Sequence, residues 1–252
     1  MKILTLLLIF HSLPAMSSTV LNFATIDYCP FTCQGNMEKP GIAIEILEKI
    51  LKGTDYELSV SFLSLKRAKS AMTSNRVHGL ILGSKVQFPN NFFPKIPAIS
   101  QPVVFFKNKE LDWTFKGISS LKNKRVGAIQ GFKYNHTKVA NFLEKSKNVI
   151  WLNHIGAHNR AFNLMELKRL DLFIAGSYVT QYKLGTSKNR SHINQTSSAI
   201  SYFDNYISLT SKLDKREREK LLKLFDSKMK ELKETRKLRE IYLRYSIIDS
   251  SL

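Results

Sequence analysis

Residues 40–62, PGIAIEILEKILKGTDYELSVSF, join a helix pattern directly to a strand pattern. In residues 42–52 the apolar side chains recur at helical spacing on one face, and Pro40-Gly41 precedes them. Residues 56–62 then alternate between apolar and polar side chains, as a strand with one buried face does. Alternating strands and helices build a sheet that is covered by helices, so this stretch predicts an α/β fold.

The same order of elements extends to both sides of this stretch. We expect a strand at residues 20–26 before it, then a basic helix at 65–75 and an apolar strand at 79–82 after it. This order predicts a parallel sheet with right-handed crossovers. Residues 88–102 hold four prolines, which predict an irregular connection before the strand at 103–106.

A second α/β series follows and then gives way to a helical tail. The expected elements of that series are strand 125–129, helix 133–145, strand 149–152, helix 157–168, strand 170–175 and helix 177–184. Residues 185–198 are polar and rich in turn formers, and residues 202–209 predict one more strand. In the tail, Asp214 and Glu217 have the spacing of a capping box at a helix start.

This arrangement predicts two α/β lobes, the first of which is interrupted by the second. We expect one lobe at residues 18–104 and 205–252 and the other at 105–204, so the chain crosses between them twice and forms a hinge. Ligands of open α/β sheets bind outside the carboxyl ends of the strands. Two such sheets that face each other therefore place both sets of strand-end loops around one cleft.

Residues 1–17 have the features of a secretory signal peptide. A basic start at Lys2 precedes an apolar run at residues 3–10, and the small residues Ala15 and Ser17 have the spacing of a cleavage site. An N-terminal core helix is the alternative. The run is far shorter than the roughly 20 apolar residues that cross a bilayer, so we expect an exported, periplasmic protein that does not span the membrane.

The two cysteines, Cys29 and Cys33, lie in one short segment. No further Cys or His lies nearby in the sequence to complete four zinc ligands, so a structural zinc site is poorly supported. Thiols of exported chains oxidise, which favours a local disulfide, with two free thiols as the alternative.

The chain is strongly basic, with 39 Lys and Arg against 20 Asp and Glu and a formal net charge of +19. Such a charge raises the question of a nucleic acid, an anionic membrane or an acidic ligand as a partner. The basic residues lack the interleaved aromatic side chains of a base-stacking surface, and in the tail they alternate with acids. We therefore expect a solvated basic surface and no nucleic-acid partner.

Several short motifs follow one another in a characteristic order. They are Tyr28-Cys29-Pro30-Phe31, Pro40-Gly41-Ile42-Ala43-Ile44-Glu45-Ile46, Lys66-Arg67-Ala68, Gly79-Leu80-Ile81, Trp113, Ser120-Leu121-Lys122-Asn123-Lys124-Arg125-Val126-Gly127 and Gly131-Phe132-Lys133-Tyr134. Individually these motifs are weak, but their order and spacing over nearly the whole chain resemble the family 3 bacterial extracellular solute-binding proteins.

The resemblance implies a type II periplasmic-binding-protein fold and a monomer without cofactor or metal. It also implies capture of a small polar solute, amino-acid-like or an organic anion, for an ABC permease. A ligand-sensing protein that signals to a membrane receptor is the main alternative. An enzyme of the same fold, such as a dehydratase, is less favoured, because the strand-end loops supply no carboxylate beyond Asp27 and no histidine pair.

The resemblance also implies where each lobe contacts the solute. In the first lobe, Tyr28 and Phe31 lie at the cleft edge or in the core, and Gly83-Ser84 ends an inner strand with close backbone approach and a hydroxyl. Arg67 either reaches the cleft or lies on the lobe surface.

In the second lobe, Gly131 is expected to open a helix whose amides suit an anion. That helix would carry Phe132, Tyr134 and Asn135, and Ser177 repeats this strand-to-helix geometry.

Two positions depart from the family members that bind free amino acids. Those proteins usually carry an Arg shortly after the third strand and an Asp after the strand at residues 170–175. Here residues 84–88 contain no Arg, and Gly176 stands in place of the Asp. Lys85 is a candidate substitute for the Arg as a point charge. The resemblance therefore does not define the solute.

Three further side chains have alternative roles. Trp113 either stacks on a ligand or packs at the hinge, and packing is favoured. His154 and His158 are four residues apart, but no third metal ligand is evident, so we expect solvated histidines and no metal site.

Overall fold

The structure, a computed structural model, describes residues 18–248 except 133, 154–155, 187–189 and 197. The expected signal peptide at residues 1–17 lies outside the described residues, as does His154. No helix within the described part of the chain is both long and apolar enough to cross a membrane.

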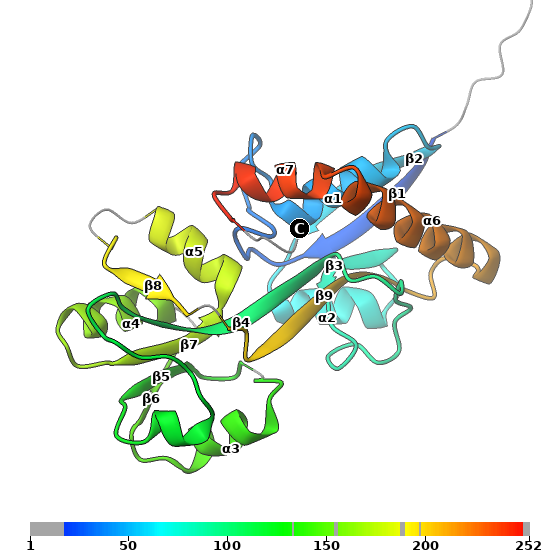
Figure 1. The fold of residues 1–252 in the computed structure, drawn as a ribbon. Coiled ribbons are helices and arrows are strands. Elements are labelled where there is room, and N and C mark those ends of the chain that lie inside the picture. Colours follow the sequence, from blue (N-terminus) through cyan, green and yellow to red (C-terminus); the bar gives the residue numbers. More distant parts are fainter. Residues whose placement is uncertain (1–17, 133, 154–155, 187–189, 197, 249–252) are drawn as a thin grey trace, which may run out of the picture.

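Strands and helices alternate along most of the chain (Figure 1). The strands are β1 (Thr19–Thr25), β2 (Tyr56–Phe62), β3 (Gly79–Gly83), β4 (Ile99–Asn108), β5 (Val126–Ile129), β6 (Val149–Leu152), β7 (Leu172–Gly176), β8 (Ile193–Gln195) and β9 (Ser201–Leu209). The helices are α1 (Ile42–Leu51), α2 (Leu65–Thr73), the 3₁₀ helix η1 (Ile118–Leu121), α3 (Thr137–Lys145), α4 (Ala157–Glu166), α5 (Ser177–Gly185), α6 (Lys215–Glu234) and α7 (Lys237–Arg244). This order confirms the predicted α/β class.

The strands form two lobes that share one continuous sheet, in the order β2-β1-β3-β9-β4-β7-β5-β6 with β8 also paired to β4. The first lobe holds β1 to β3 with α1, α2, α6 and α7, and the second holds β5 to β8 with α3 to α5 (Figure 1). The pairs β1–β2, β1–β3, β5–β6 and β5–β7 are parallel, as predicted. The long strands β4 and β9 pair antiparallel and connect the lobes, so the expected separate sheets are in fact joined.

Both faces of the sheet are covered in each lobe because side chains alternate along the strands. In β1, Phe23 packs in the cluster that includes α1, α6 and α7, whereas Ala24 packs against α2. In β4 of the second lobe, Phe105 packs towards α3 and Phe106 towards α4. Continuous apolar runs such as β7 are therefore strands buried on both faces.

Most elements lie within about two residues of their expected bounds, but three segments differ more from the structure. The helix expected at 133–145 begins at Thr137, where the His136 side chain accepts a hydrogen bond from the Val139 N–H and caps the first turn. The polar segment 185–198 contains the short strand β8. The irregular connection expected at 88–102 ends before Ile99, where β4 begins.

Pro102 therefore lies inside a strand. It is tolerated because β4 pairs there with β9 only, and its pairing with β7 begins at Val103. A proline lacks an N–H, which costs nothing on the side of a strand that has no partner. At the other end of the chain, the predicted cap of α6 is confirmed, since the Asp214 side chain accepts from the Glu217 N–H at 2.9 Å.

Candidate functional site

A cavity of about 210 Å³ lies where the two lobes meet. The first lobe contributes Tyr28, which follows β1. The second lobe contributes the remaining described lining residues, which come from the end of β5 and the loop after it, the N-terminus of α4 and helix α5. They are Ile129, Phe132, Gly156, His158, Asn159, Val179 and Lys183.

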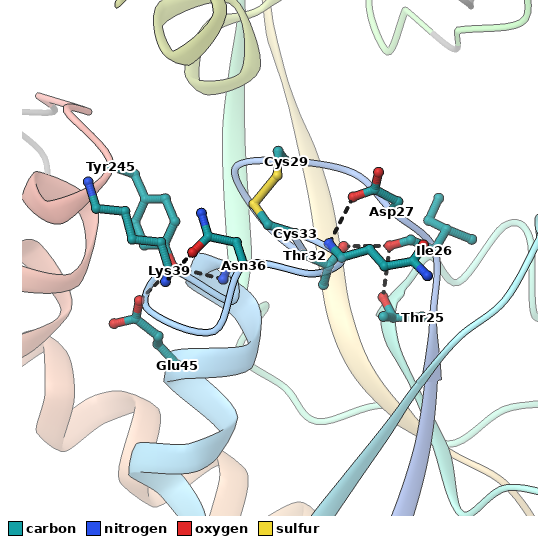
Figure 2. The surroundings of a disulfide bond; sticks show 12 residues. Thr25, Ile26, Asp27, Cys29, Thr32, Cys33, Asn36, Lys39, Glu45 and Tyr245 are labelled. Carbon is teal, nitrogen blue, oxygen red and sulfur yellow. Dashed lines mark hydrogen bonds between the residues drawn. A yellow bond between two sulfur atoms is a disulfide. The ribbon is translucent and has the colours of Figure 1, made fainter. Parts of the chain in front are cut away.

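Tyr28 is carried by a tightly constrained loop, residues 26–41, which we call the cysteine loop. Cys29 and Cys33 form a disulfide, as predicted (Figure 2). The backbone of Tyr28 donates to the Thr32 carbonyl at 2.7 Å. The Thr32 hydroxyl donates to the Ile26 carbonyl at 2.8 Å. The loop therefore closes on itself beside the cavity.

A buried carboxylate fixes the far end of the cysteine loop to the C-terminal helix. Glu45, in the first turn of α1, is only 4% exposed and accepts from the Tyr245 hydroxyl at 2.5 Å and from Arg244 at 2.7 Å. The same hydroxyl accepts from the Gly41 N–H at 2.7 Å (Figure 2). Burial and the neighbouring carboxylate raise the pKa of Tyr245 above its ordinary value, so it stays neutral and donates.

Tyr28 lies at the boundary between the lobes, whereas Phe31 lies beneath it. Phe31 is fully buried and makes edge contacts with Tyr28 and with Tyr178 of α5, at centroid distances of 5.7 and 6.4 Å. In this conformation Phe31 thus supports the cavity without lining it. Burial raises the pKa of Tyr28 to about 12, and a side-chain hydrogen bond with Gln101 opposes that rise.

Gln101 of β4 is a central residue that sequence reasoning missed. Its side chain is 1% exposed, and its Oε1 accepts from the Val179 N–H at 3.2 Å, in the first turn of α5. It also occupies the space next to Gly176, where an added Cβ would lie only 2.4 Å from Gln101 Cδ. The absence of an Asp at position 176 therefore has a steric reason, because a buried amide fills that place.

The segment that precedes α3, residues 130–136, is an aromatic loop and not the expected helix start. The Tyr134 hydroxyl accepts from the Ile129 N–H at 2.7 Å and donates to the Ile174 carbonyl at 3.3 Å. Burial raises the pKa of Tyr134 well above its ordinary value. Phe132 packs on Tyr134 and lines the cavity, whereas Asn135 donates to the Tyr202 carbonyl of β9 at 3.2 Å.

Gly131 has a positive φ of 79° at the turn after β5, and nothing lies within 4 Å of an added Cβ. It therefore serves the turn conformation and does not open a helix. The expectation that helix amides begin at Gly131 is wrong because His136 caps α3 five residues later.

The helix end that does lie at the cavity belongs to α4. Gly156 is its N-cap, without a side-chain cap, and His158 and Asn159 in the first turn line the cavity. His158 is 8% exposed and packs against Phe173 at 5.5 Å, so the expectation of a solvated histidine is wrong. No sequence pattern marks these residues, since a polar side chain in a first helical turn is common.

The other predicted first-lobe contacts lie away from the cavity. Ser84 is 8% exposed, and its Oγ accepts from the Gln87 N–H within a turn. An added Cβ at Gly83 would lie 2.6 Å from Ser208 Oγ, so this glycine serves the close approach of β9. Arg67 is exposed on α2, and Lys85 lies over the Tyr206 ring at 4.7 Å.

Ser177 and Trp113 make structural contacts. Ser177 is 1% exposed and donates to Gln195 Oε1 of β8 at 2.6 Å. Trp113 packs edge-on against Phe105 and donates to the Ser120 carbonyl at 2.8 Å, as the packing interpretation predicted. Among the described residues, no group of three or more His, Cys, Asp or Glu side chains is arranged to hold a metal ion.

No protein-family profile and no curated protein matches the sequence. Solved structures do resemble the fold. Substrate-binding domain 2 of Lactococcus lactis GlnP, in its open conformation, is 17% identical with a TM-score of 0.68, covering 91% of this chain and 97% of that one. The ligand-binding core of GluR0 in complex with L-glutamate is 17% identical with a TM-score of 0.66, covering 91% and 99%.

A histidine kinase sensor domain with similarity to periplasmic binding proteins has 14% identity and a TM-score of 0.61, covering 91% of this chain and 96% of that one. At these identities the likeness shows the fold: the chain has the two-lobed architecture of periplasmic binding proteins. The three structures are a substrate-binding domain, a ligand-binding core and a sensor domain.

Proposed function

Because the chain has the two-lobed fold of periplasmic binding proteins, we propose that it captures a small polar solute between its lobes and delivers it to an ABC importer. The observation that carries the proposal is the cavity at the lobe boundary, which is lined by Tyr28 from one lobe and by three segments of the other. In this role the chain acts outside the cytoplasm, as a monomer and without catalysis.

The proposed mechanism is closure around the solute. A closed state is favoured when only that state makes contacts from both lobes to the solute. The hinge consists of the two crossings, β4 and β9. Strand β4 changes partner from β9 to β7 at Val103, and β9 changes partner from β4 at Asn205 to β3 at Tyr206. These changes of partner support one lobe at residues 18–104 and 205–252 and a second lobe at residues 105–204.

The capture proposal is tested by a thermal-shift screen over organic acids, amino acids and short peptides, since a ligand that binds only the folded state raises its melting temperature. A compound that binds should also lower the radius of gyration in small-angle X-ray scattering. Binding in the cavity with an unchanged radius of gyration would contradict the closure mechanism.

A pair of matched variants locates the site. Phe132→Ala removes an aromatic ring that lines the cavity and should abolish most of the ligand-induced rise in melting temperature. Trp151→Ala removes a 44% exposed ring on β6 of the same lobe and should leave that rise unchanged. If both variants respond to ligand like the wild type, the solute binds elsewhere.

The second candidate function is ligand sensing, because one of the similar structures is a sensor domain. Deleting the protein separates the two roles once a solute is known. Loss of uptake of that solute supports delivery to an importer. Normal uptake with a lost transcriptional response supports a receptor as the partner instead.

A further inference from the structure

The polar groups around the cavity are biased towards positive charge and hydrogen-bond donors. We propose that the solute is a small organic anion with a carboxylate and an apolar body, and that it lacks an amine. This inference rests on the proposed function and specifies the chemical class of its solute.

Among the described residues that line the cavity, Lys183 in the last turn of α5 carries a positive charge. Asn159 lines the same cavity, and its Oδ1 already accepts a hydrogen bond from Arg190 at 3.0 Å. The amide oxygen of Asn159 is thus engaged by a protein donor, while its NH₂ group adds two donors. A carboxylate, which only accepts hydrogen bonds, matches this arrangement.

No described residue that lines the cavity carries a carboxylate. The sequence segments that supply its second-lobe residues, 126–143, 153–165 and 177–200, contain no Asp or Glu at all. The nearest acid to Tyr28 in sequence is Asp27, whose Oδ1 accepts from the Gln34 N–H within the cysteine loop. An ammonium group held in this cavity would lose hydration without gaining a counter-ion, which is costly.

Four of the other lining residues favour an apolar body. Ile129, Phe132 and Val179 present apolar side chains, and Tyr28 adds an aromatic ring. Binding sites of this kind bury an apolar body and orient it with a few polar groups. The expected solute therefore has a carboxylate at one end near Lys183 and a hydrocarbon or aromatic portion.

Matched probes test the charge preference directly. One series is hexanoate, norleucine and pentylamine, and the other is 3-phenylpropionate, phenylalanine and 2-phenylethylamine. Within each series the apolar body is nearly constant, while the head group changes from anion to zwitterion to cation. By calorimetry or thermal shift, the anion of a series should bind roughly tenfold more tightly than the zwitterion, and the cation should not bind measurably.

Variants of one lysine test the source of the preference. Lys183→Gln should weaken anion binding roughly tenfold, and Lys183→Glu should shift the preference towards the amine. Lys145→Gln removes a charge from an exposed position on α3 that does not line the cavity, and it should leave all affinities unchanged. Equal anion affinity in the wild type and in Lys183→Gln would overturn the assignment of Lys183.

The outcomes separate this inference from the proposed function. Binding of norleucine or phenylalanine as tightly as their amine-free partners would overturn the inference and leave solute capture standing. If none of the six probes binds, the inference is tested by the compounds that bind in the wider screen. Binding compounds that carry an amine or lack a carboxylate would overturn it. If no compound in either set binds, the proposed function itself fails.

Discussion

The cysteine loop and the aromatic loop occupy equivalent places in the two lobes. Each leads from a strand into a helix, from β1 to α1 or from β5 to α3, and each presents one aromatic ring to the cavity, Tyr28 or Phe132. The cysteine loop is held by a disulfide and by the buried Glu45. The described residues of the aromatic loop are held by neutral hydrogen bonds and by the packing of the Phe132 ring.

The difference indicates which side of the cavity adapts to a solute. A covalent link and a charge-assisted hydrogen bond are stronger constraints than the amide and hydroxyl bonds of Tyr134, Asn135 and His136. We therefore expect the first lobe to present Tyr28 as a fixed wall, and the second lobe to carry most of the adjustable contacts. Denaturation of variants on each side of the cavity measures the strength of these constraints.

The largest loss of stability is expected from substitution of Tyr178, where the two lobes are joined. Although it belongs to α5, its buried ring lies in the first-lobe core, 6.4 Å from Phe31 of the cysteine loop and 5.2 Å from Tyr242. Tyr178→Ala should lower the free energy of unfolding by about 3–5 kcal/mol, measured by urea denaturation. Tyr178→Phe keeps the ring and should cost far less; equal losses would show that ring packing is not the cause.

The next largest loss of stability is expected at Glu45, which fixes the far end of the cysteine loop. Glu45→Ala removes the acceptor for Tyr245 and Arg244 and should cost about 2 kcal/mol of unfolding free energy, because the buried Tyr245 hydroxyl loses its partner. Glu219→Ala on α6, an exposed acid, is the control and should change stability by less than about 0.5 kcal/mol. Similar values for the two variants would mean that the disulfide alone holds the loop.

A smaller effect is expected in the aromatic loop. His136→Ala removes the N-cap of α3 and should cost about 1 kcal/mol in the same denaturation experiment. His136→Asn supplies another good capping side chain and should restore most of the loss. If alanine costs as much here as at Glu45, the two loops are constrained equally and the comparison fails.

The smallest effect is a pH dependence in the first lobe. His78 Nδ1 accepts from the Asn22 N–H at 2.9 Å, and burial together with Lys212 lowers the pKa of His78 below its ordinary value. The unfolded chain then binds a proton more readily, so stability falls as the pH drops through about 6.5. Denaturation between pH 7.5 and 5 should show this decline, and His78→Gln should flatten it; an unchanged decline would assign it to another group.

The fold was largely predictable because its signals are local. Residues 56–62 alternate and form β2 with the expected bounds, and the Asp214 cap of α6 follows from two side chains three residues apart. The false start of α3 shows the limit of such signals. Residues 133–136 do not break a helix pattern, but Tyr134 and Asn135 gain bonds to strands that are distant in sequence.

The site was less predictable for the same reason. The disulfide was expected from one short segment, and the cleft edge was one of the two places considered for Tyr28, which lines the cavity. In contrast, Asn159 and Lys183 line one cavity, and Gln101 accepts from the Val179 N–H, only through the tertiary arrangement of β4, α4 and α5. A glutamine in a strand or a lysine near a helix end carries no periodic or motif signal.

The side chain of Gln101 also constrains the order in which this site can change during evolution. An Asp at position 176 would require a Cβ within 2.4 Å of an amide that is already bonded to Tyr28 and to the α5 backbone. That substitution is disfavoured until residue 101 has become smaller, and the smaller residue alone leaves the Val179 N–H unsatisfied. A mutational path from this cavity to one with a carboxylate at position 176 therefore passes through a destabilised intermediate, so the two positions are expected to change together.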